Sequence, residues 1–118
     1  MTLKLKSTFK DKQMFIIKQN DTSPAIQVKL RTPQNQAVNL IGASVKFHMK
    51  HESGTLKISS DAIVVDEAAG IVKYEWKSGD TSKEGIHYAE FQVTYEDESI
   101  ETFPNKDYIK IRITKELA

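Results

Sequence analysis

The sequence predicts an all-β fold, a sandwich of short antiparallel strands, from two observations. Apolar and polar residues alternate through several short segments, as they do in strands with one buried face and one solvated face. Turn-forming residues separate these segments at close intervals, and no stretch shows a sustained helical period with caps. Antiparallel sheets with one buried face each account for both patterns.

Five segments alternate cleanly enough to be predicted as strands. In one of them, Val45 and Phe47 fall on one face, whereas Lys46 and His48 fall on the other. Such segments are typical of antiparallel sheets with one face in the core. The five predicted strands cover residues 26–30, 43–49, 72–76, 89–95 and 109–113.

Two continuous apolar runs, at residues 14–17 and 62–65, are also expected to be strands. Each run is short and rich in β-branched or aromatic residues, which favours a strand over a helix. Residues 56–58 and 3–5 suggest two further short strands. The whole chain is therefore expected to contain about eight strands.

Turn chemistry separates the strands at residues 21–24, 32–35, 52–54, 69–70, 78–80 and 103–105. Pro, Gly, Asn and Asp at these places are the residues that tight turns favour. About eight short strands at this spacing indicate a sandwich or a small barrel with Greek-key connections. We expect an immunoglobulin-like antiparallel β-sandwich.

The segment from Asp80 to Ala89 has two interpretations. An acidic turn residue, then Gly85, then a tyrosine that opens a strand is similar to the tyrosine corner of immunoglobulin-like sandwiches, in which the hydroxyl bonds upstream backbone. The other interpretation is an ordinary tyrosine at a wet strand boundary. The spacing favours neither of them.

The length of 118 residues suits a single domain, and we assign residues 1–118 to it. Hydrophobic residues make up 39% and charged residues 28% of the chain, which is typical of a soluble globular protein. No apolar run is long enough to span a bilayer, and residues 1–6 lack the apolar stretch of a signal peptide. We expect cytoplasmic synthesis and no membrane partner.

The charges nearly balance, with 17 Lys and Arg against 16 Asp and Glu and a formal net charge of +1. This balance provides no net field to attract a polyanion, which argues against nucleic acid as a partner. The chain has no cysteine, so disulfides, thiolate nucleophiles and cysteine-based zinc sites are excluded. Five lysines in the first segment are interpreted as solvated side chains that discourage edge-to-edge aggregation: Lys4, Lys6, Lys10, Lys12 and Lys18.

The histidines are not predicted to bind metal. His48 and His51 lie three residues apart at the end of an alternating strand, which places them on opposite faces. We expect both to be solvated, His48 on the outer face and His51 at the start of the turn before Gly54. His87 lies at a strand entry without a carboxylate or nucleophile near it in the sequence.

The other candidate residues also have structural explanations. Acidic groups at 66–67 and 96–98 fall at strand ends without the spacing of a calcium loop, so we expect solvated carboxylates. No phosphate loop, nucleophile elbow or zinc-helix motif occurs, and the sequence predicts no enzyme, catalytic residue, cofactor or metal site. Six aromatic residues are expected mostly in the core: Phe15, Phe47, Tyr74, Trp76, Phe91 and Tyr95.

Tyr88 and Tyr108 differ from these aromatic residues because both fall on the polar side of their strand alternations. Exposed aromatic rings are able to stack on a ligand. A carbohydrate- or surface-binding β-sandwich is therefore the alternative function that the residues themselves suggest.

Several short segments of the sequence, taken in order, resemble the N-terminal domain of phage baseplate upper proteins. They are residues 15–24, 40–47, 70–76, Gly79-Asp80-Thr81 with Gly85, 89–95 and 101–105. Their order and the Phe103-Pro104-Asn105 ending carry the resemblance, which covers residues 13–114. In one departure, Asn20 stands where Gly is expected before Asp21; since Asn tolerates a left-handed backbone, we expect the turn to be retained.

The resemblance implies an immunoglobulin-like, non-catalytic module that docks to the core of a siphophage baseplate and anchors a host-adsorption subunit. The implied partners are other phage tail proteins, and the implied location is the virion tail. Association between copies of the same chain stays open as an alternative. In that family a trimerising stalk follows the domain. The sequence ends at Ala118, so we expect a truncated or a stand-alone relative. The resemblance carries over no catalytic residue, and no motif places its partner-binding residues.

Overall fold

The computed structural model describes residues 14–55 and 57–117, and this part of the chain contains nine strands and no helix. The predicted strand at residues 3–5 lies outside the described residues. The strands are β1 (Met14–Lys18), β2 (Ile26–Lys29), β3 (Ser44–His51), β4 (Ile58–Asp61), β5 (Ile63–Asp66), β6 (Ile71–Tyr74), β7 (Gly85–Thr94), β8 (Ile100–Phe103) and β9 (Ile109–Thr114).

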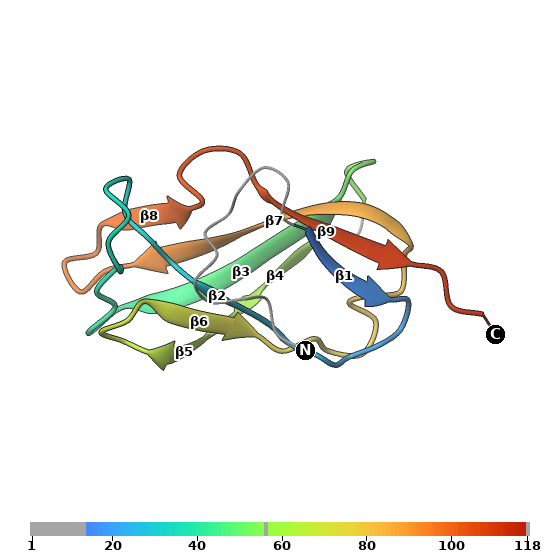
Figure 1. The fold of residues 1–118 in the computed structure, drawn as a ribbon, viewed down its shortest axis with the longest axis horizontal. Coiled ribbons are helices and arrows are strands. Elements are labelled where there is room, and N and C mark those ends of the chain that lie inside the picture. The colour runs from blue at the N-terminus through green and yellow to red at the C-terminus, as the bar shows by residue number, and fades with distance from the viewer. Residues whose placement is uncertain (1–13, 56, 118) are drawn as a thin grey trace.

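The nine strands form two sheets that pack face to face (Figure 1). The larger sheet has six strands, in the order β1-β9-β7-β3-β4, with β8 also paired to β7. The smaller sheet has three strands, in the order β2-β6-β5, and lies below the larger one in Figure 1. This arrangement confirms the predicted all-β, immunoglobulin-like sandwich.

One strand pair runs in parallel. β1 pairs with β9 so that Met14 lies opposite Lys110 and Lys18 lies opposite Thr114. Alternation within a strand does not reveal the direction of its neighbour, because parallel and antiparallel strands share a side-chain period of two. The sandwich therefore differs from the predicted antiparallel pattern at this one pair.

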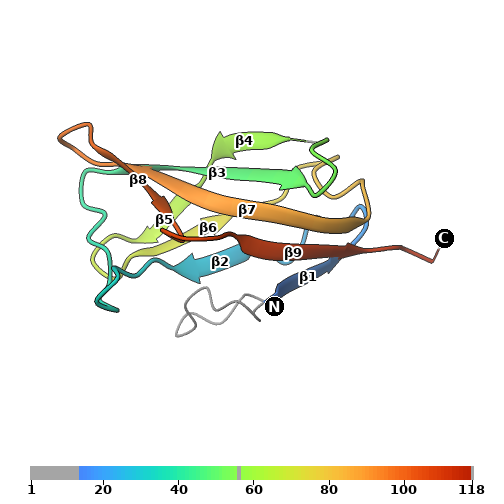
Figure 2. The same cartoon turned by 90° about the horizontal axis from the view of Figure 1, so that it is seen from above.

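β7 is the longest strand and organises the larger sheet (Figure 2). One of its sides pairs with β3, and the other pairs with two strands that lie end to end: β9 along Gly85–Ala89 and β8 along Phe91–Thr94. Pro104 directly follows β8 and has no N–H to continue the ladder. The loop of residues 104–108 therefore interrupts this side of the sheet.

The core lies between the two sheets, with Phe47 at its centre. The Phe47 ring stacks on Tyr74 at a centroid distance of 4.3 Å and an interplanar angle of 11°, and it lies 5.1 Å from the ring of Phe91. Of the six aromatic residues predicted mostly in the core, five are buried and Tyr95 is half-buried. The alternations therefore identified the buried faces correctly.

Trp76 is buried although it lies outside a strand. β6 ends at Tyr74, two residues earlier than the alternation predicted. The indole Nε1–H of Trp76 donates a hydrogen bond to the Pro24 carbonyl at 3.0 Å. Trp76 therefore connects the segment after β6 to the loop before β2.

The turn at Asn20 is retained, as predicted from the tolerance of Asn for a left-handed backbone. Asn20 has a φ angle of 68°, in the left-handed region that Asn tolerates better than most residues. Its N–H donates to the Thr81 carbonyl at 3.0 Å, and the buried Thr81 hydroxyl donates to the Asp21 carbonyl at 2.8 Å. These bonds connect the β1–β2 turn to the loop between β6 and β7.

Tyr88 is an ordinary boundary tyrosine rather than a tyrosine corner, because its ring lies against Tyr108 on the outer face of the sheet. The hydroxyl that holds the loop before β7 belongs to Tyr74, which donates to the Asp80 carboxylate. The same carboxylate accepts the Lys77 N–H at 2.9 Å. Burial, and then the hydrogen bond to Asp80, raise the pKa of Tyr74.

Candidate functional site

A shallow groove lies on the outer face of the six-stranded sheet and has a volume of about 380 Å³. We call it the tyrosine groove. Its floor is the outer face of β3, between β4 on one side and β7 with the loop before β9 on the other. The lining residues are His48, Met49, Lys50, Lys57, Ile58, Ser59, Tyr88, Glu90 and Tyr108.

The structure brings Tyr88 and Tyr108 together at one side of this groove. The β7–β9 register pairs Tyr88 with Lys110, so Tyr108 is the diagonal neighbour of Tyr88 on the same face. The two ring centroids lie 5.7 Å apart with an interplanar angle of 49°, and 60% of Tyr108 is exposed. The prediction that both tyrosines lie on the polar face is confirmed.

Cationic side chains outnumber acidic ones in the tyrosine groove. Lys50 and Lys57 are both exposed there, and Glu90 is the single carboxylate in the lining. The ion pairs formed by the described residues, Lys46–Asp61 at 2.9 Å and Lys73–Glu75 at 3.1 Å, involve no groove residue. The charges of both groove lysines therefore face solvent and are available to a partner.

An acidic turn projects from the opposite end of the same sheet, between β7 and β8. We call Glu96, Asp97 and Glu98 the acidic tip; all three are exposed, as predicted, and Asp66 and Glu67 are too. The backbone N–H of Ser99, at 3.0 Å, and its hydroxyl both donate to the Asp97 carboxylate. These hydrogen bonds lower the pKa of Asp97, which keeps the carboxylate ionised.

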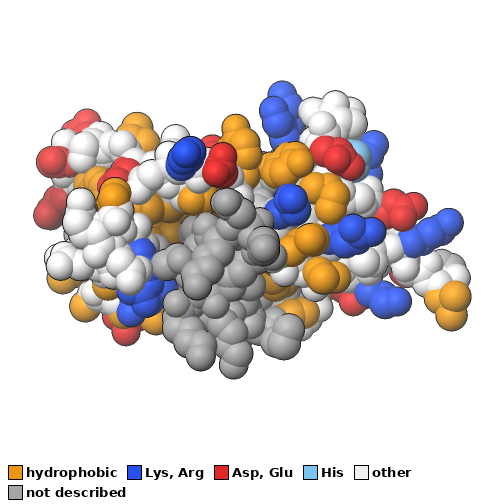
Figure 3. Space-filling model, turned by 45° about the horizontal axis from the view of Figure 1, so that its top comes forward, with side chains coloured by type: hydrophobic (Ala, Val, Ile, Leu, Met, Phe, Trp, Pro, Cys, Tyr) orange, Lys and Arg blue, Asp and Glu red, His pale blue; other side chains and the backbone are white. Residues whose placement is uncertain are grey.

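Exposed isoleucines accompany the acidic tip. Ile41 is 60% exposed and lines a hollow together with Glu96 and Asp97, and Ile100 at the start of β8 is 61% exposed. In Figure 3 acidic side chains gather at the left end, where the hairpin lies, while most Lys and Arg side chains lie to its right. The acidic tip with its exposed isoleucines and the tyrosine groove with its lysines therefore lie at different positions along the length of the larger sheet.

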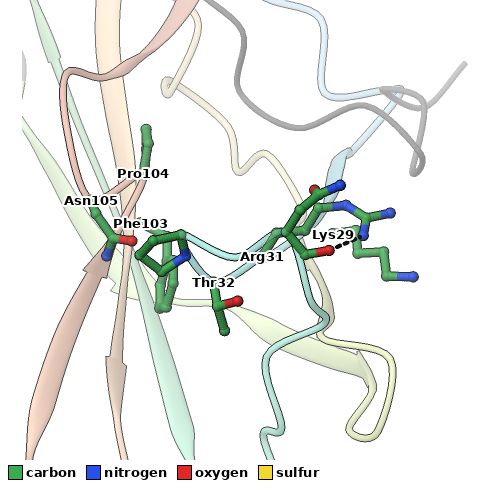
Figure 4. A pocket seen from close by; sticks show the side chains of 8 residues that line it. Lys29, Arg31, Thr32, Phe103, Pro104 and Asn105 are labelled. Atoms are coloured by element: carbon green, nitrogen blue, oxygen red, sulfur yellow. Dashed lines mark hydrogen bonds between the residues drawn. The ribbon is translucent and has the colours of Figure 1, made fainter.

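A second hollow, of about 240 Å³, lies between the end of β2 and the loop after β8 (Figure 4). Lys29 and Arg31 come from the β2 side, and Phe103–Asn105 come from the other side. The guanidinium Nη1 of Arg31 donates to the Asn35 carbonyl at 3.2 Å. The lining includes no histidine or carboxylate.

The structure corrects the prediction that His51 is solvated at the start of a turn. β3 continues through His51, and this ring is only 9% exposed. His87 is fully buried, and the two rings meet edge to face with centroids 4.9 Å apart. His48 is half-buried on the outer face, so the prediction that His48 and His51 lie on opposite faces is confirmed.

The two buried rings have different hydrogen bonds. Nδ1 of His51 accepts the Ser53 N–H at 3.0 Å, and its Nε2 therefore donates to the Glu84 carbonyl at 3.2 Å. Gly85 permits this contact, since a Cβ there would lie 2.7 Å from Nε2 of His51. Nε2 of His87 is buried with no partner among the described residues. Burial lowers the pKa of His87, and the neighbouring His51 lowers it further.

Lowering the pH from 7 to 5 should reduce the free energy of unfolding through His87. Its pKa in the folded state lies below the ordinary value of 6.5, so the unfolded chain binds the proton more readily. The stabilising contribution is complete above the unfolded pKa and is lost as pH falls toward the folded pKa. One such group changes the free energy by at most about 1.4 kcal/mol per pH unit. Urea midpoints across this range provide the measurement.

The His87→Phe variant is the control because it keeps a buried ring and removes the titrating group. Its urea midpoint should change less between pH 7 and 5 than that of the parent chain. Asp61 and Asp97 also have lowered pKa values, but their contributions are lost only as pH falls below about 3.8. Equal pH slopes for the variant and the parent would show that His87 does not cause the effect.

The described residues contain no cluster of three or more His, Asp and Glu side chains arranged to hold a metal ion. Within the same residues, no helix has the length and apolar character needed to cross a bilayer. Of the five lysines predicted to be solvated in the first segment, the structure describes Lys18, which is exposed.

Comparison with known proteins identifies one matching family and similar folds. The family model of the BppU N-terminal domain matches residues 1–104. The N-terminal domain of ORF48 from phage TP901-1 is similar with a TM-score of 0.60 and 14% identity, over 98% of this chain and 95% of that chain. At this identity, the likeness concerns the fold alone.

A more distant similarity is to the crystal structure of CopC from Methylosinus trichosporium OB3b. It has a TM-score of 0.49 and 13% identity, over 89% of this chain and 87% of that chain. This similarity is too remote to indicate a function. A comparison with curated proteins found no match.

Proposed function

Since the chain belongs to the family of BppU N-terminal domains, the N-terminal domains of phage baseplate upper proteins, we propose that it is a non-catalytic docking module. In this role it anchors a host-adsorption subunit to the tail baseplate through protein–protein contacts. Family membership carries the proposal, because the match includes the acidic tip and most of the tyrosine groove.

The surface of the sandwich supports a docking role. Tyrosines such as Tyr88 and Tyr108 are enriched at protein interfaces, where a ring supplies apolar area and the hydroxyl remains wet. The lysines beside them supply rim charges that select an acidic partner surface. Residues 1–118 act as one domain in this proposal, which buries part of a sheet face and its loops against the partner.

Phage tail proteins are the partners in this proposal, and the virion tail is the place of action. In this proposal the chain is synthesised in the host cytoplasm and joins the baseplate during assembly. Specificity comes from the shape of the sheet face and from charges at its rim, as is usual for interfaces that form between prefolded partners.

Co-expression with the tail proteins of the same phage or prophage tests this function. One of them should co-elute with the chain as a stoichiometric complex in size-exclusion chromatography. An unrelated immunoglobulin-like sandwich with the same tag is the matched control. If no tail protein co-elutes, and antibody labelling detects no copy of the chain at the tail tip of purified virions, the docking function is wrong.

Binding of a carbohydrate is the second candidate function, and the pairing of Tyr88 with Tyr108 favours it. The two rings present apolar surface beside the hydrogen-bonding side chains of Ser59 and Glu90. Calorimetric titration with purified bacterial surface glycans should then show binding that Tyr88→Ala abolishes. If no glycan of such a panel binds the folded parent chain, this function is excluded.

A further inference from the structure

The acidic tip and the tyrosine groove are complementary surfaces of the larger sheet, and we propose that the acidic tip of one copy docks into the tyrosine groove of a second copy of this chain. This inference goes beyond the proposed function, whose partners are other tail proteins. Both contacts use the tyrosine groove, and they coexist in one assembly because the last copy of a head-to-tail row keeps its groove free for a tail protein.

Charge complementarity is the first argument for this contact. The tip presents three exposed carboxylates, and residues 95–100 contain no Lys or Arg. The groove presents the exposed ammonium groups of Lys50 and Lys57, with Glu90 as its only carboxylate. Neither lysine takes part in the ion pairs formed by the described residues, so both are able to face an incoming carboxylate.

Apolar complementarity is the second argument. Ile41 and Ile100 are mostly exposed next to the tip. Covering an exposed isoleucine side chain lowers the free energy, because apolar surface is removed from water. The exposed ring of Tyr108 and the neighbouring ring of Tyr88 provide an apolar surface for them. Aromatic side chains in such positions contribute strongly to interfaces.

Hydrogen bonds within the turn also hold the tip in one conformation. The Tyr95 N–H donates to the Ser99 carbonyl at 2.8 Å, and the Glu98 N–H donates to the Tyr95 carbonyl at 2.8 Å. The Asp97 carboxylate accepts two hydrogen bonds from Ser99. A turn that is already ordered loses little conformational entropy on docking.

The tip cannot reach the groove of its own copy. Both surfaces are fixed to β7, and the seven residues from Tyr88 to Thr94 span about 20 Å, because six steps of about 3.3 Å separate the first from the last. The contact therefore joins two copies head to tail. Such a heterologous contact leaves a free tip and a free groove, so it closes into a ring or continues as a chain of copies.

The contact involves few residues, and its area lies below the roughly 1,200–2,000 Å² that stable interfaces bury. Association is therefore expected to be weak and to need a high protein concentration. It should also weaken at high salt, because the exposed charges are screened beyond about 8 Å at physiological ionic strength.

Charge reversal at each surface tests the inference by sedimentation velocity at increasing protein concentration and low salt. The average mass of the parent chain should rise with concentration. Reversal of the groove charges (Lys50→Glu with Lys57→Glu) should abolish the rise, as should reversal of the tip charges (Glu96→Lys with Glu98→Lys). An equal mixture of the two variants should restore it, because each supplies the surface that complements the other.

Three controls make the result specific. Lys83→Glu changes the charge in an exposed loop outside the groove and should leave association intact, and Tyr108→Ala should weaken association without a change in charge. Circular dichroism and thermal unfolding verify that every variant is folded.

A parent chain that stays monomeric at low salt overturns the inference. So does a mixture of the two reversed variants that fails to associate, or a Lys83→Glu variant that loses association as well. These outcomes do not affect the proposed docking function, which is tested by co-elution with tail proteins.

Discussion

Replacing Phe47 by alanine should lower the free energy of unfolding by about 3–5 kcal/mol, the usual loss for a fully buried aromatic residue. Phe47 is completely buried, and its ring contacts the rings of Tyr74, Trp76 and Phe91 at centroid distances between 4.3 and 5.7 Å. Alanine would remove this packing and leave a cavity between the two sheets. Since whole domains are stable by about 5–15 kcal/mol, the variant should be marginally folded.

Urea titration followed by the fluorescence of Trp76, the single tryptophan, provides the measurement. Tyr108→Ala is the matched control, because it removes an aromatic ring from the surface and should change stability by less than about 0.5 kcal/mol. If the two variants unfold at the same urea concentration, Phe47 does not lie at the centre of the core.

Replacing Trp76 by alanine should also cost about 3–5 kcal/mol, partly for a different reason. The indole packs against Phe15, Phe47 and Tyr74, and it donates the hydrogen bond to the Pro24 carbonyl. Its removal would open a cavity and leave that carbonyl without its protein donor. Circular dichroism in urea measures the change, because the variant has no tryptophan to report fluorescence.

Trp76→Phe separates packing from hydrogen bonding. This variant keeps an aromatic ring in the core and removes only the indole N–H and part of the volume. A lost hydrogen bond to a partly buried carbonyl costs at most about 1–3 kcal/mol, less than the loss of the whole ring, so Trp76→Phe should be more stable than Trp76→Ala. Equal losses for both variants would show that ring packing contributes little at this position.

Side-chain alternation was sufficient to predict most of the sandwich. It identified the central strands of the larger sheet, because inward residues such as Val45, Phe91 and Ile111 repeat with a period of two. β8 was not predicted, since only Phe103 of its four residues is buried and the others are exposed or half-buried. The parallel direction of β1 depends on a partner more than ninety residues away in the chain, which no local pattern encodes.

The same alternation contained a signal for the buried histidines. Val45, Phe47 and Met49 face inward, and His51 is the next residue of that series; His87 similarly precedes Ala89. The predicted strand ends at residue 49, whereas β3 continues through His51, so the prediction missed the contact between His51 and His87. The tyrosine groove was only partly predictable. The alternation predicts that Tyr88 and Tyr108 are exposed, but it does not reveal the β7–β9 register that brings them together.

The parallel pairing of β1 with β9 also determines how the protein resists mechanical force. A pull that moves Met14 away from Thr114 loads all five register pairs at once, in shear. A pull between Lys18 and Thr114, which lie opposite each other, loads the pairs one after another and opens them like a zipper. Single-molecule extension should therefore need a higher force in the first direction, which is the direction along which a chain held at both ends of the sandwich is stretched.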